Sequence, residues 1–314
     1  MKVYNHTKIA ETYKNSVLAI GNFDGIHLGH KKVFSYCKKI AKKNKIKFGV
    51  LTFSPLPVMF FNKKIKNFRI NSEYQKLDFL KKNYVDFVVS IKFDKKFSNI
   101  YAEDFIKKII YKKINPNLIV VSNNFKFGKN RKGDTKLLKK FSKKYDYKLL
   151  EISPFKNSKK VVSSTIIRKS LEKGEINLAN KLLARTWFVV GKVVRGKKIG
   201  RKLGFRTCNI SMKDYILPRH GIYAVKVSLN NSNEKKLYNG VAYLGSRPTF
   251  NGKKVILETN IFNLNKKLYG KKIKVYFLKF LRGDQKFTNS YQLTRQMNKD
   301  VILAKKGLQT KLLS

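Results

Sequence analysis

Residues 17–30 decide the fold of this chain and read Val17-Leu18-Ala19-Ile20-Gly21-Asn22-Phe23-Asp24-Gly25-Ile26-His27-Leu28-Gly29-His30. An apolar run leads into a glycine-rich turn, and the residues from about 28 to 43 are typical of a helix. Glycine lets the backbone turn tightly and approach a ligand closely. The N-terminus of the following helix offers unpaired N–H groups that suit a phosphate. The stretch therefore predicts a strand, a phosphate-binding turn and a helix.

The rest of the first half alternates in the same way. Apolar, strand-like runs follow at Phe48–Phe53, Phe87–Ile91 and Leu118–Val121. Helices are expected near Glu73–Lys82 and at Tyr101–Lys113, with closing helices over Ser164–Leu183. Alternation of this kind favours an α/β fold with a parallel, doubly wound sheet, whose ligands bind at the carboxyl ends of the strands.

After Arg185 the pattern changes to short strands joined by turn-rich loops. The expected strands are Trp187–Val194, Gly221–Leu229, Leu237–Leu244, Val255–Phe262 and Lys272–Leu281. A final helix is expected over Ser290–Lys306. The second half therefore predicts a small antiparallel β-barrel with a C-terminal helix. We expect two domains, residues 1–184 and residues 185–314.

The composition limits the classes of function. The chain has 314 residues and a formal net charge of +53, mostly from lysines that are spread along the chain in pairs such as Lys38-Lys39. A dedicated nucleic-acid surface would concentrate its charge on one face, so we expect a biased composition and no specific nucleic-acid partner. A weak homo-oligomer is compatible with the sequence, which does not determine the oligomeric state.

The same composition bears on location. No apolar stretch approaches the roughly 20 residues that span a bilayer, and residues 1–6 lack the pattern of a signal peptide. Cys37 and Cys208 lie far apart without metal-ligand spacing, which argues against a disulfide framework or a zinc site. We therefore expect a cytoplasmic protein without a membrane partner.

Two motifs in the first 184 residues suit phosphate. His27 and His30 are spaced to lie on one face of the first helical turn, where both imidazoles can donate to phosphate oxygens. The run Ser163-Ser164-Thr165 with Arg168 places hydroxyls and a guanidinium at the start of another helix. The alternative for the second motif is an ordinary helix N-cap, for which serine and threonine are preferred.

A third candidate lies in the second half. Residues 191–209 form a basic, glycine-rich run that lacks the Walker A pattern and is expected to be a flexible loop. Phosphate binding and a plain barrel connection both remain open for this run on its residues alone.

Together the first two motifs resemble the nucleotidyltransferase superfamily, and the Gly21–His30 pattern is similar to the adenylyltransferase half of bacterial bifunctional riboflavin kinase/FAD synthetases. Further matches are Thr52–Pro57, Asn124–Gly128 and Arg131–Asp134. The resemblance implies a Rossmann-like domain in which His27 and His30 hold the phosphates of ATP and are catalytic. The implied ATP- and phosphate-binding residues are Gly21, Phe23, Asp24, Gly25, His27, Gly29, His30, Asn124, Arg131, Ser163, Ser164, Thr165 and Arg168.

The second half resembles riboflavin kinases in Gly200–Asn209, Gly245–Phe250, Leu257-Glu258 and the flavin-side segment Leu281–Phe287. The resemblance implies that Thr207 and Asn209 coordinate Mg²⁺ and that Glu258 is the catalytic base for the ribityl hydroxyl. The implied ATP- and flavin-binding residues are Gly196, Gly200, Arg201, Gly204, Thr207, Asn209, Arg247 and Arg282. The expected activity is phosphorylation of riboflavin to FMN and adenylylation of FMN to FAD. ATP is the co-substrate, Mg²⁺ is the cofactor and the flavins are substrates and products.

The chain departs from the family pattern at several positions. Ser54 replaces an acidic residue, Leu56 a histidine and Ser122 a glycine, while Arg206 replaces a proline and Tyr243 an asparagine. The last two lie beside the implied kinase site. They motivate one alternative, an FMN adenylyltransferase with an impaired kinase domain. The high basic charge motivates another, a basic RNA-binding protein on an enzyme scaffold.

Overall fold

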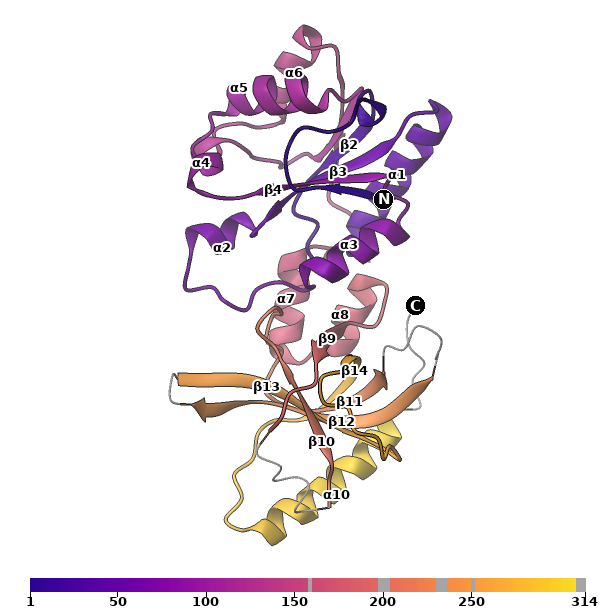
Figure 1. The fold of residues 1–314 in the computed structure, drawn as a ribbon, viewed down its shortest axis with the longest axis vertical. Helices are drawn as coiled ribbons and strands as arrows, with labels where there is room; N and C mark the ends of the chain where they lie inside the picture. Colours follow the sequence, from indigo (N-terminus) through magenta and orange to yellow (C-terminus); the bar gives the residue numbers. More distant parts are fainter. Residues whose placement is uncertain (158–159, 197–203, 230–235, 250–251, 309–314) are drawn as a thin grey trace. The chain divides into compact units, whose positions relative to one another are not determined.

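The computed structural model describes residues 1–157, 160–196, 204–229, 236–249 and 252–308 (Figure 1). The chain folds into two compact units. The first consists of Met1–Lys66 and Glu73–Ser163, and the second of Asn67–Ser72 and Ser164–Ser314. The domain boundary expected between residues 184 and 185 stays a prediction. The compact units reflect contacts in space, whereas the expected boundary divides the chain at one point of the sequence.

The first unit is built on a six-stranded parallel sheet. Its strands are β1 (Lys2–Tyr4), β2 (Val17–Ile20), β3 (Phe48–Ser54), β4 (Phe87–Lys92), β5 (Leu118–Ser122) and β6 (Lys148–Ile152). Their order is β1-β4-β3-β2-β5-β6, and every pair is parallel. The chain builds outward from β2 through β3 to β4, then returns to the other side of β2 with β5. The strand order therefore reverses next to β2, where ligands bind in sheets of this type.

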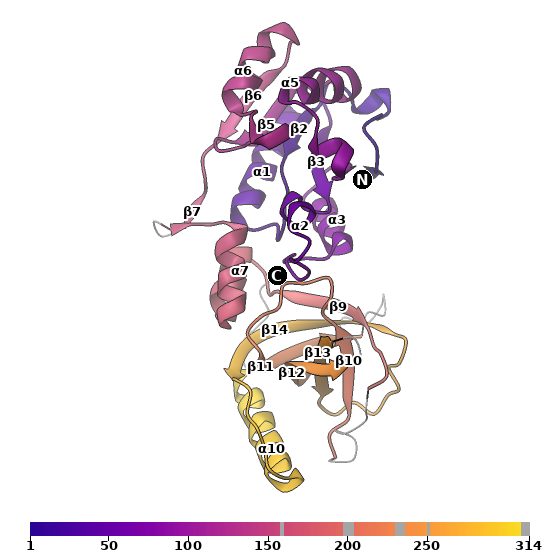
Figure 2. The same cartoon turned by 90° about the vertical axis from the view of Figure 1, so that its left-hand side faces the viewer.

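Helices cover both faces of this sheet (Figures 1 and 2). They are α1 (Leu28–Lys43), α2 (Pro57–Phe61), α3 (Glu73–Lys82), α4 (Lys95–Ser98), α5 (Ala102–Asp104), η2 (Phe105–Ile114) and α6 (Thr135–Lys144). Leu18 and Ile20 of β2 pack in one core cluster with the buried side chains of η2. Phe34 of α1 meets Phe48, whose side chain points to the opposite face, at a ring distance of 6.0 Å. The expected doubly wound α/β fold is confirmed.

One expected α-helix has a different form. Tyr101–Lys113 was expected to be a single helix, but α5 gives way at Phe105 to the π-helix η2. Its buried residues Phe105, Ile106, Ile109, Ile110 and Ile114 recur at intervals of four to five, close to the wider turn of a π-helix. The apolar spacing fits both helix types, so the sequence alone did not separate them.

The second unit is built on a six-stranded antiparallel sheet. Its strands are β9 (Phe188–Lys192), β10 (Thr207–Ser211), β11 (Gly221–Ser228), β12 (Leu237–Thr249), β13 (Gly252–Ile261) and β14 (Lys272–Arg282). Their order is β10-β13-β12-β11-β14-β9. The N–H of Val194, just after β9, donates to the carbonyl of Asn209 in β10 over 2.9 Å, which brings the two edge strands together. The expected antiparallel barrel is confirmed as a nearly closed one.

Among its described residues, the second unit contains the helices α7 (Ser164–Lys173), α8 (Ile176–Leu183) and the C-terminal α10 (Ser290–Gly307). Helix α10 packs on the outside of the barrel, where Ala304 and Leu308 meet Ala224 and Leu278. The expected C-terminal helix is therefore confirmed. In the first unit, the short strands β7 (Lys156–Asn157) and β8 (Lys160–Val161) pair with each other.

The basic run 191–209 is not one flexible loop. Its first residues belong to β9, as the strand expected at Trp187–Val194 requires, but its last residues form β10, where the expectation of a loop was wrong. Strand β10 forms because Cys208 and Ile210 are buried on one side while Asn209 pairs with Glu258 of β13. Three polar residues among five concealed this strand in the sequence.

A short segment from the first half of the chain, Asn67–Ser72, belongs to the second unit. The Asn67 side chain donates to the carbonyls of Met212 and Tyr215, over 2.7 and 2.9 Å. The indole N–H of the fully buried Trp187 donates to the carbonyl of Ile70 over 2.8 Å. The segment is therefore an integral part of the second unit.

Candidate active sites

The two histidines of the Gly21–His30 turn lie against each other. His27 is the N-cap residue of α1, and His30 lies in its first turn. Their ring centroids are 3.7 Å apart and the planes differ by 20°, so the imidazoles stack. The ring of Phe23 meets His30 edge-on at 5.2 Å. Both imidazoles are thus held together at the N-terminus of α1, beside the point where the strand order reverses.

The backbone of this turn adopts conformations that side chains rarely take. Phe23 and Ile26 have φ values of 48° and 39°, and Gly25 has 86°. Positive φ at a bulky or β-branched residue is a genuine outlier, and such strain concentrates at functional sites. At Gly29, a Cβ atom would lie 3.1 Å from Cε1 of His27. A glycine there lets the His27 ring lie against the helix backbone.

Buried hydrogen bonds connect the Gly21–His30 turn to the parallel sheet. The hydroxyl of Thr52 in β3 donates to the Asn22 carbonyl over 3.1 Å. The ammonium of Lys76 in α3 lies 3.5 Å from that hydroxyl and 2.9 Å from a carboxylate oxygen of Glu73. The Lys76 side chain is only 5% exposed. A buried lysine requires a partner of this kind, and neither Thr52 nor Lys76 was singled out in the sequence as a buried contact.

The second phosphate motif begins α7. Ser164 is the first residue of the helix, Ser163 precedes it and Thr165 is exposed. Arg168 lies with its guanidinium 3.7 Å above the ring of Phe68 and donates through Nε to the Phe68 carbonyl over 2.9 Å. These residues belong to the second unit, apart from Ser163, whereas His27 and His30 belong to the first. A joint action of the two sets on one nucleotide stays a prediction.

Asn124 and Arg131 lie in the segment after β5. Both are exposed, and Arg131 has a φ of 58° beside the short helix η3 (Lys129–Arg131). Asp134 orders the end of this segment, because its carboxylate accepts from the Leu137 N–H over 3.1 Å and lies 3.1 Å from the Lys126 ammonium. The hydrogen bond from Leu137 and then the one from Lys126 hold the pKa of Asp134 below its usual value.

Sequence reasoning missed an aromatic cluster just beyond β3 and β4. Phe60 and Phe61 of α2 meet Phe93 at ring distances of 5.4 and 5.7 Å, and Phe93 lies 6.0 Å from Phe53. Phe61 is 69% exposed. The only signal in the sequence was phenylalanine beside Ser54-Pro55, which is weak in a chain with 23 phenylalanines.

The implied kinase residues lie in one row across the barrel sheet. Asn209 of β10 is directly opposite Glu258 of β13, and Glu258 is directly opposite Tyr243 of β12. Thr207 is opposite Asn260 two residues along. Directly opposed residues of antiparallel strands point to the same face with Cβ atoms about 5 Å apart. The implied metal ligands and the implied base therefore share one face.

The chemistry around Asn209 suits a hard cation. Asn209 is 5% exposed, and its buried Oδ1 has no hydrogen-bond partner. A Cβ atom at Gly196 would lie 2.2 Å from Nδ2 of Asn209, so the loop backbone approaches this side chain closely. An amide oxygen without a hydrogen-bond partner, on the same face of β10 as a threonine, fits Mg²⁺, which prefers oxygen ligands and keeps several waters. The residues present therefore fit the expected ion.

Arg206, which replaces a proline, takes part in two hydrogen bonds. Its guanidinium donates to Oδ1 of Asn265, and its carbonyl accepts from the Asn260 side chain over 2.8 Å. It also lines an open cavity of about 530 Å³ together with Gly204, Phe205, residues 260–265, Val301 and Lys305. These bonds restrain the loop next to Thr207 where proline would have restrained it.

Several expected site residues cannot be placed at the level of side chains. Gly200 and Arg201 lie outside the described residues. For Arg247 the structure describes only the backbone, in β12 opposite Lys254. The role expected for each of the three stays a prediction.

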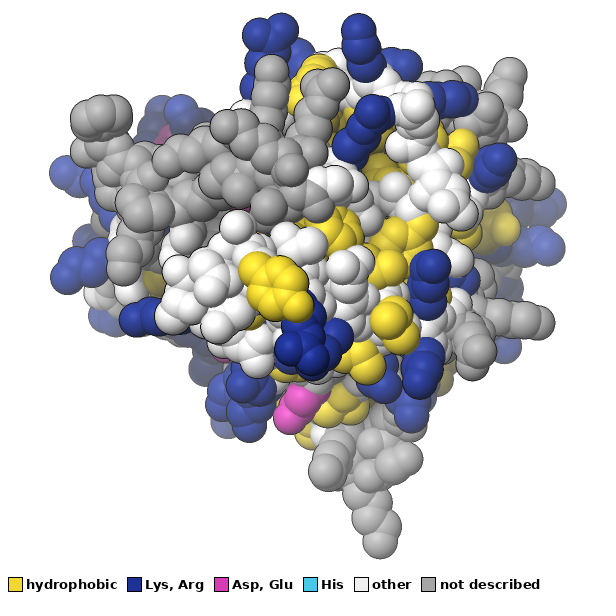
Figure 3. All heavy atoms as spheres, turned by 90° about the horizontal axis from the view of Figure 1, so that it is seen from below, with side chains coloured by type: hydrophobic (Ala, Val, Ile, Leu, Met, Phe, Trp, Pro, Cys, Tyr) yellow, Lys and Arg dark blue, Asp and Glu magenta, His cyan; other side chains and the backbone are white. Residues whose placement is uncertain are grey.

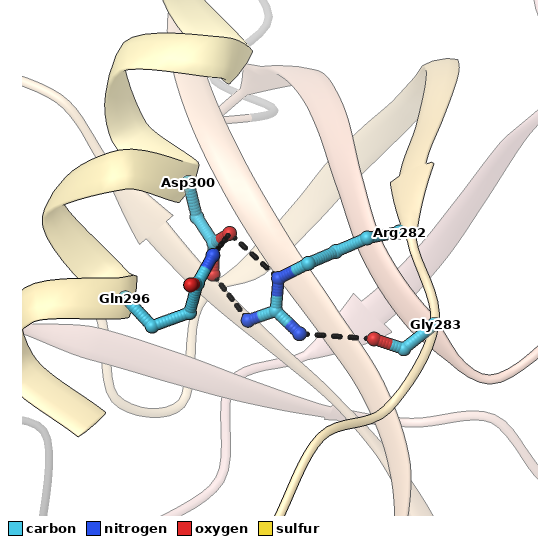
Figure 4. Close-up of polar contacts among 4 residues, drawn as sticks. All are labelled: Arg282, Gly283, Gln296 and Asp300. Carbon is cyan, nitrogen blue, oxygen red and sulfur yellow. Dashed lines mark hydrogen bonds and ion pairs between the residues drawn. The ribbon is translucent and has the colours of Figure 1, made fainter. Parts of the chain in front are cut away.

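Arg282 binds within the protein (Figure 4). Its Nε and Nη2 donate to the two carboxylate oxygens of Asp300 over 2.7 and 2.6 Å, and Nη1 donates to the Gly283 carbonyl over 2.9 Å. Gln296 also donates to Asp300 over 2.9 Å. Arg282 thus joins the end of β14 to α10, and its expected contact with ATP or flavin stays a prediction.

The surface charge follows no concentrated pattern on the face drawn in Figure 3. Lys and Arg side chains there are scattered among hydrophobic and uncharged ones. Among the helices of the described part of the chain, none is both long enough and apolar enough to cross a membrane.

Comparisons with known proteins cover both halves. Residues 9–166 match the family model for FAD synthetase, and residues 183–308 match the one for riboflavin kinase. The chain is 40% identical over 295 residues to the bifunctional riboflavin kinase/FMN adenylyltransferase of Buchnera aphidicola subsp. Schizaphis graminum, covering 93% of this chain and 94% of that protein. It is 32% identical over 289 residues to the protein of the same name from Escherichia coli K12, covering 92% and 91%.

The whole fold also recurs in a solved structure. A crystal structure named as a macrolide-efflux protein from Streptococcus pneumoniae has a TM-score of 0.84 and 28% identity, covering 96% of this chain and 98% of that one. With two family models in tandem and relatives at 32–40% identity over more than nine tenths of the chain, this protein belongs to the family of bifunctional riboflavin kinase/FMN adenylyltransferases.

Proposed function

We propose that this chain phosphorylates riboflavin to FMN and then adenylylates FMN to FAD with release of pyrophosphate. The observation that carries the proposal is that each set of motifs produces a site geometry on its own sheet. The stacked imidazoles lie at the N-terminus of α1 beside the parallel sheet. The Asn209–Glu258 pair lies across two strands of the barrel.

In the adenylyltransferase reaction, a phosphate oxygen of FMN attacks the α-phosphorus of ATP and pyrophosphate leaves. The nucleophile is already anionic, so a strong base is not required. His27 and His30 donate to the triphosphate, and the positive end of α1 favours its charge. As the resemblance implies, Ser164, Thr165 and Arg168 also bind phosphates of ATP. Each well-placed donor contributes about 3–4 kcal/mol to the stability of the transition state.

The aromatic cluster at α2 is proposed as the platform for the isoalloxazine ring of FMN. Phe60, Phe61 and Phe93 present ring edges and faces beyond the carboxyl ends of β3 and β4. A planar flavin stacks on such rings with about 0.5–1.5 kcal/mol per aromatic pair beyond the area that it buries. Leu56, which replaces a histidine, directly precedes α2 and is 3% exposed.

In the kinase reaction, Glu258 takes the proton of the ribityl 5′-hydroxyl, whose oxygen attacks the γ-phosphorus of ATP, and ADP leaves. Glu258 is half-buried and lies in the same row as Asn209. The side chains of Thr207 and Asn209 would hold Mg²⁺, which neutralises charge on the transferring phosphate when it is bound. The bonds of Arg206 support an ordered site and give no support to the alternative with an impaired kinase domain.

A cytoplasmic location without a membrane or specific nucleic-acid partner is part of the proposal. Cys37 and Cys208 are buried free thiols, and burial raises the pKa of each to about 12. Both therefore stay protonated and unreactive at neutral pH. On the face drawn in Figure 3 the basic side chains are scattered, which gives no support to the RNA-binding alternative. The oligomeric state stays open.

Purified protein supplied with riboflavin, ATP and MgCl₂ should yield FMN and then FAD on chromatography. His27→Ala should lower FAD formation about 100-fold while sparing FMN formation, as expected for the loss of one donor. Glu258→Gln should do the reverse. FAD from supplied FMN with none from riboflavin would leave only the adenylyltransferase. Loss of both activities in either folded variant would refute the assignment of two sites.

A further inference from the structure

Helix α10 forms a wall of two separate cavities in the second unit. Gln292, Gln296 and Lys299 line an open cavity of about 480 Å³ whose other wall includes Gln285 and Phe287. On another side of the helix, Val301 and Lys305 line the cavity of about 530 Å³ beside Phe205 and Arg206. A displacement of α10 would therefore change both cavities at once.

The attachment of α10 to the barrel combines an apolar and an ionic contact. The apolar contact lies at the C-terminal end of the helix, where Ala304 and Leu308 pack on Ala224 and Leu278. The ionic contact lies one turn earlier, at Asp300. Apolar packing is not directional, so it leaves the tilt and rotation of the helix less defined than a hydrogen-bonded contact would.

Asp300 supplies that directional contact (Figure 4). Its carboxylate is 4% exposed and accepts two hydrogen bonds from the guanidinium of Arg282, over 2.7 and 2.6 Å. A bidentate carboxylate–guanidinium pair fixes relative orientation as well as distance. Gln296, which lines the first cavity, donates to the same carboxylate over 2.9 Å.

Arg282 also binds the backbone just before the opposite wall of the first cavity. Its Nη1 donates to the Gly283 carbonyl over 2.9 Å, at the point where the chain leaves β14 for residues 285–287. The two walls are therefore joined through four hydrogen bonds among Arg282, Gly283, Gln296 and Asp300.

We propose that Asp300 is a positioning residue of the kinase, which sets α10 through Arg282 so that both cavities fit their ligands. The inference rests on the proposed kinase activity, with riboflavin in the first cavity and the nucleotide in the second. Asp300 does not act on the reacting atoms, because its carboxylate is buried and occupied by Arg282 and Gln296. Thr207 and Asn209 lie on β10 and Glu258 on β13, so none of the three belongs to α10.

Because Asp300 positions α10 and does not act on the reacting atoms, its substitution should affect substrate binding more than the chemical step. Asp300→Asn keeps the shape of the side chain but removes the charge that matches Arg282. The KM values for riboflavin and for ATP in the kinase reaction should rise about tenfold, since sub-ångström misplacement has effects of this order. The kcat should fall by less than threefold, and adenylylation of supplied FMN should stay unchanged.

A double variant separates positioning from stability. Arg282→Met with Asp300→Leu replaces the pair by apolar residues, which generally restores resistance to unfolding. It restores neither the fixed orientation nor the bond to Gly283, so the KM values should remain raised. Val227→Ala serves as the matched control, because Val227 is fully buried in β11 and away from α10. It should lower Tm and leave both KM values unchanged.

The experiment measures Tm, kinase kinetics for each substrate and adenylylation for the wild type and the three variants. Raised KM values in both pair variants, with an unchanged KM in Val227→Ala, would support the proposal. Wild-type KM values in folded Asp300→Asn, or recovery of KM together with Tm in the double variant, would overturn it while the kinase function stands. A wild type that forms no FMN from riboflavin would overturn the kinase function and this inference with it.

Discussion

Gly29 offers a test in which stability and activity should move in opposite directions. Gly29→Ala adds one methyl group in the first turn of α1, where the nearest atoms are Cε1 and Nδ1 of His27 at 3.1 and 3.2 Å and Cβ of Phe155 at 3.4 Å. Comfortable contact between such atoms begins near 3.5 Å, so the imidazole must move by about 0.4 Å. Cβ of Phe155 limits movement of the added methyl group away from His27.

The magnitude follows from this displacement. A misplacement of about 1 Å at a catalytic group costs about 100-fold, so about 0.4 Å should cost roughly five- to tenfold, or about 1–1.4 kcal/mol of activation free energy. Alanine favours a helix over glycine by up to about 1 kcal/mol. The Tm of Gly29→Ala should therefore stay the same or rise while its kcat/KM for FAD formation falls.

The assay compares FAD formation from supplied FMN with FMN formation from riboflavin in the same preparation. Gly307→Ala is the matched control, because its added methyl group would meet Ala224 at an ordinary 3.4 Å in the other unit. It should leave FAD formation unchanged. FAD formation by Gly29→Ala within twofold of the wild type, or an equal loss in both reactions, would refute the role given to the His27 ring.

Three further predictions concern other parts of the chain. Asn209→Ala should raise the Mg²⁺ concentration needed for half-maximal FMN formation and spare FAD formation from FMN, as a magnesium titration of both reactions can show. Asp134→Ala should lower Tm at pH 7, because a carboxylate whose pKa is lowered in the folded protein stabilises the fold above its ordinary pKa. The hydrogen bond from the Leu137 N–H is the first cause of the lowered pKa of Asp134, and the difference in Tm from the wild type should vanish as the pH falls through that pKa. A difference in Tm that persists at pH 2 would contradict this prediction. Trp187→Phe should cost about 1–3 kcal/mol in chemical denaturation, since it removes the buried donor to the Ile70 carbonyl, and a loss below 0.5 kcal/mol would mean that the bond contributes little.

The sequence predicted those parts of the fold in which burial alone sets the pattern. The runs at Val17–Ile20, Phe48–Ser54 and Leu118–Ser122 are buried almost throughout, so an apolar run was a sufficient signal. Strand β10 was missed because its pairing depends on β13, more than 40 residues away, and its own residues are largely polar. The π-helix was missed because its apolar spacing also fits an α-helix.

Some residues of the candidate sites could be predicted from the sequence, and others could not. The stacked pair His27 and His30 was predictable, because its geometry is set within one helical turn. Asp300 was not, because a single acidic residue on a helix usually faces solvent, and only the fold brings Arg282 to it. Lys76 was hidden among 71 basic residues for the same reason. Local motifs are readable in a sequence, whereas buried charges need the tertiary contact that neutralises them.

The placement of Asn67–Ser72 in the second unit has a consequence for the order in which this protein matures on the ribosome. Asn67 is synthesised 145 residues before Met212, whose carbonyl accepts one of its side-chain hydrogen bonds. At about 5–20 residues per second, this segment waits roughly 7–30 s for its partners. Throughout that interval the six residues lie within the nascent first unit without their partners from the second unit. A gene fragment that starts at residue 185 would encode a barrel lacking the carbonyl that caps the Trp187 indole.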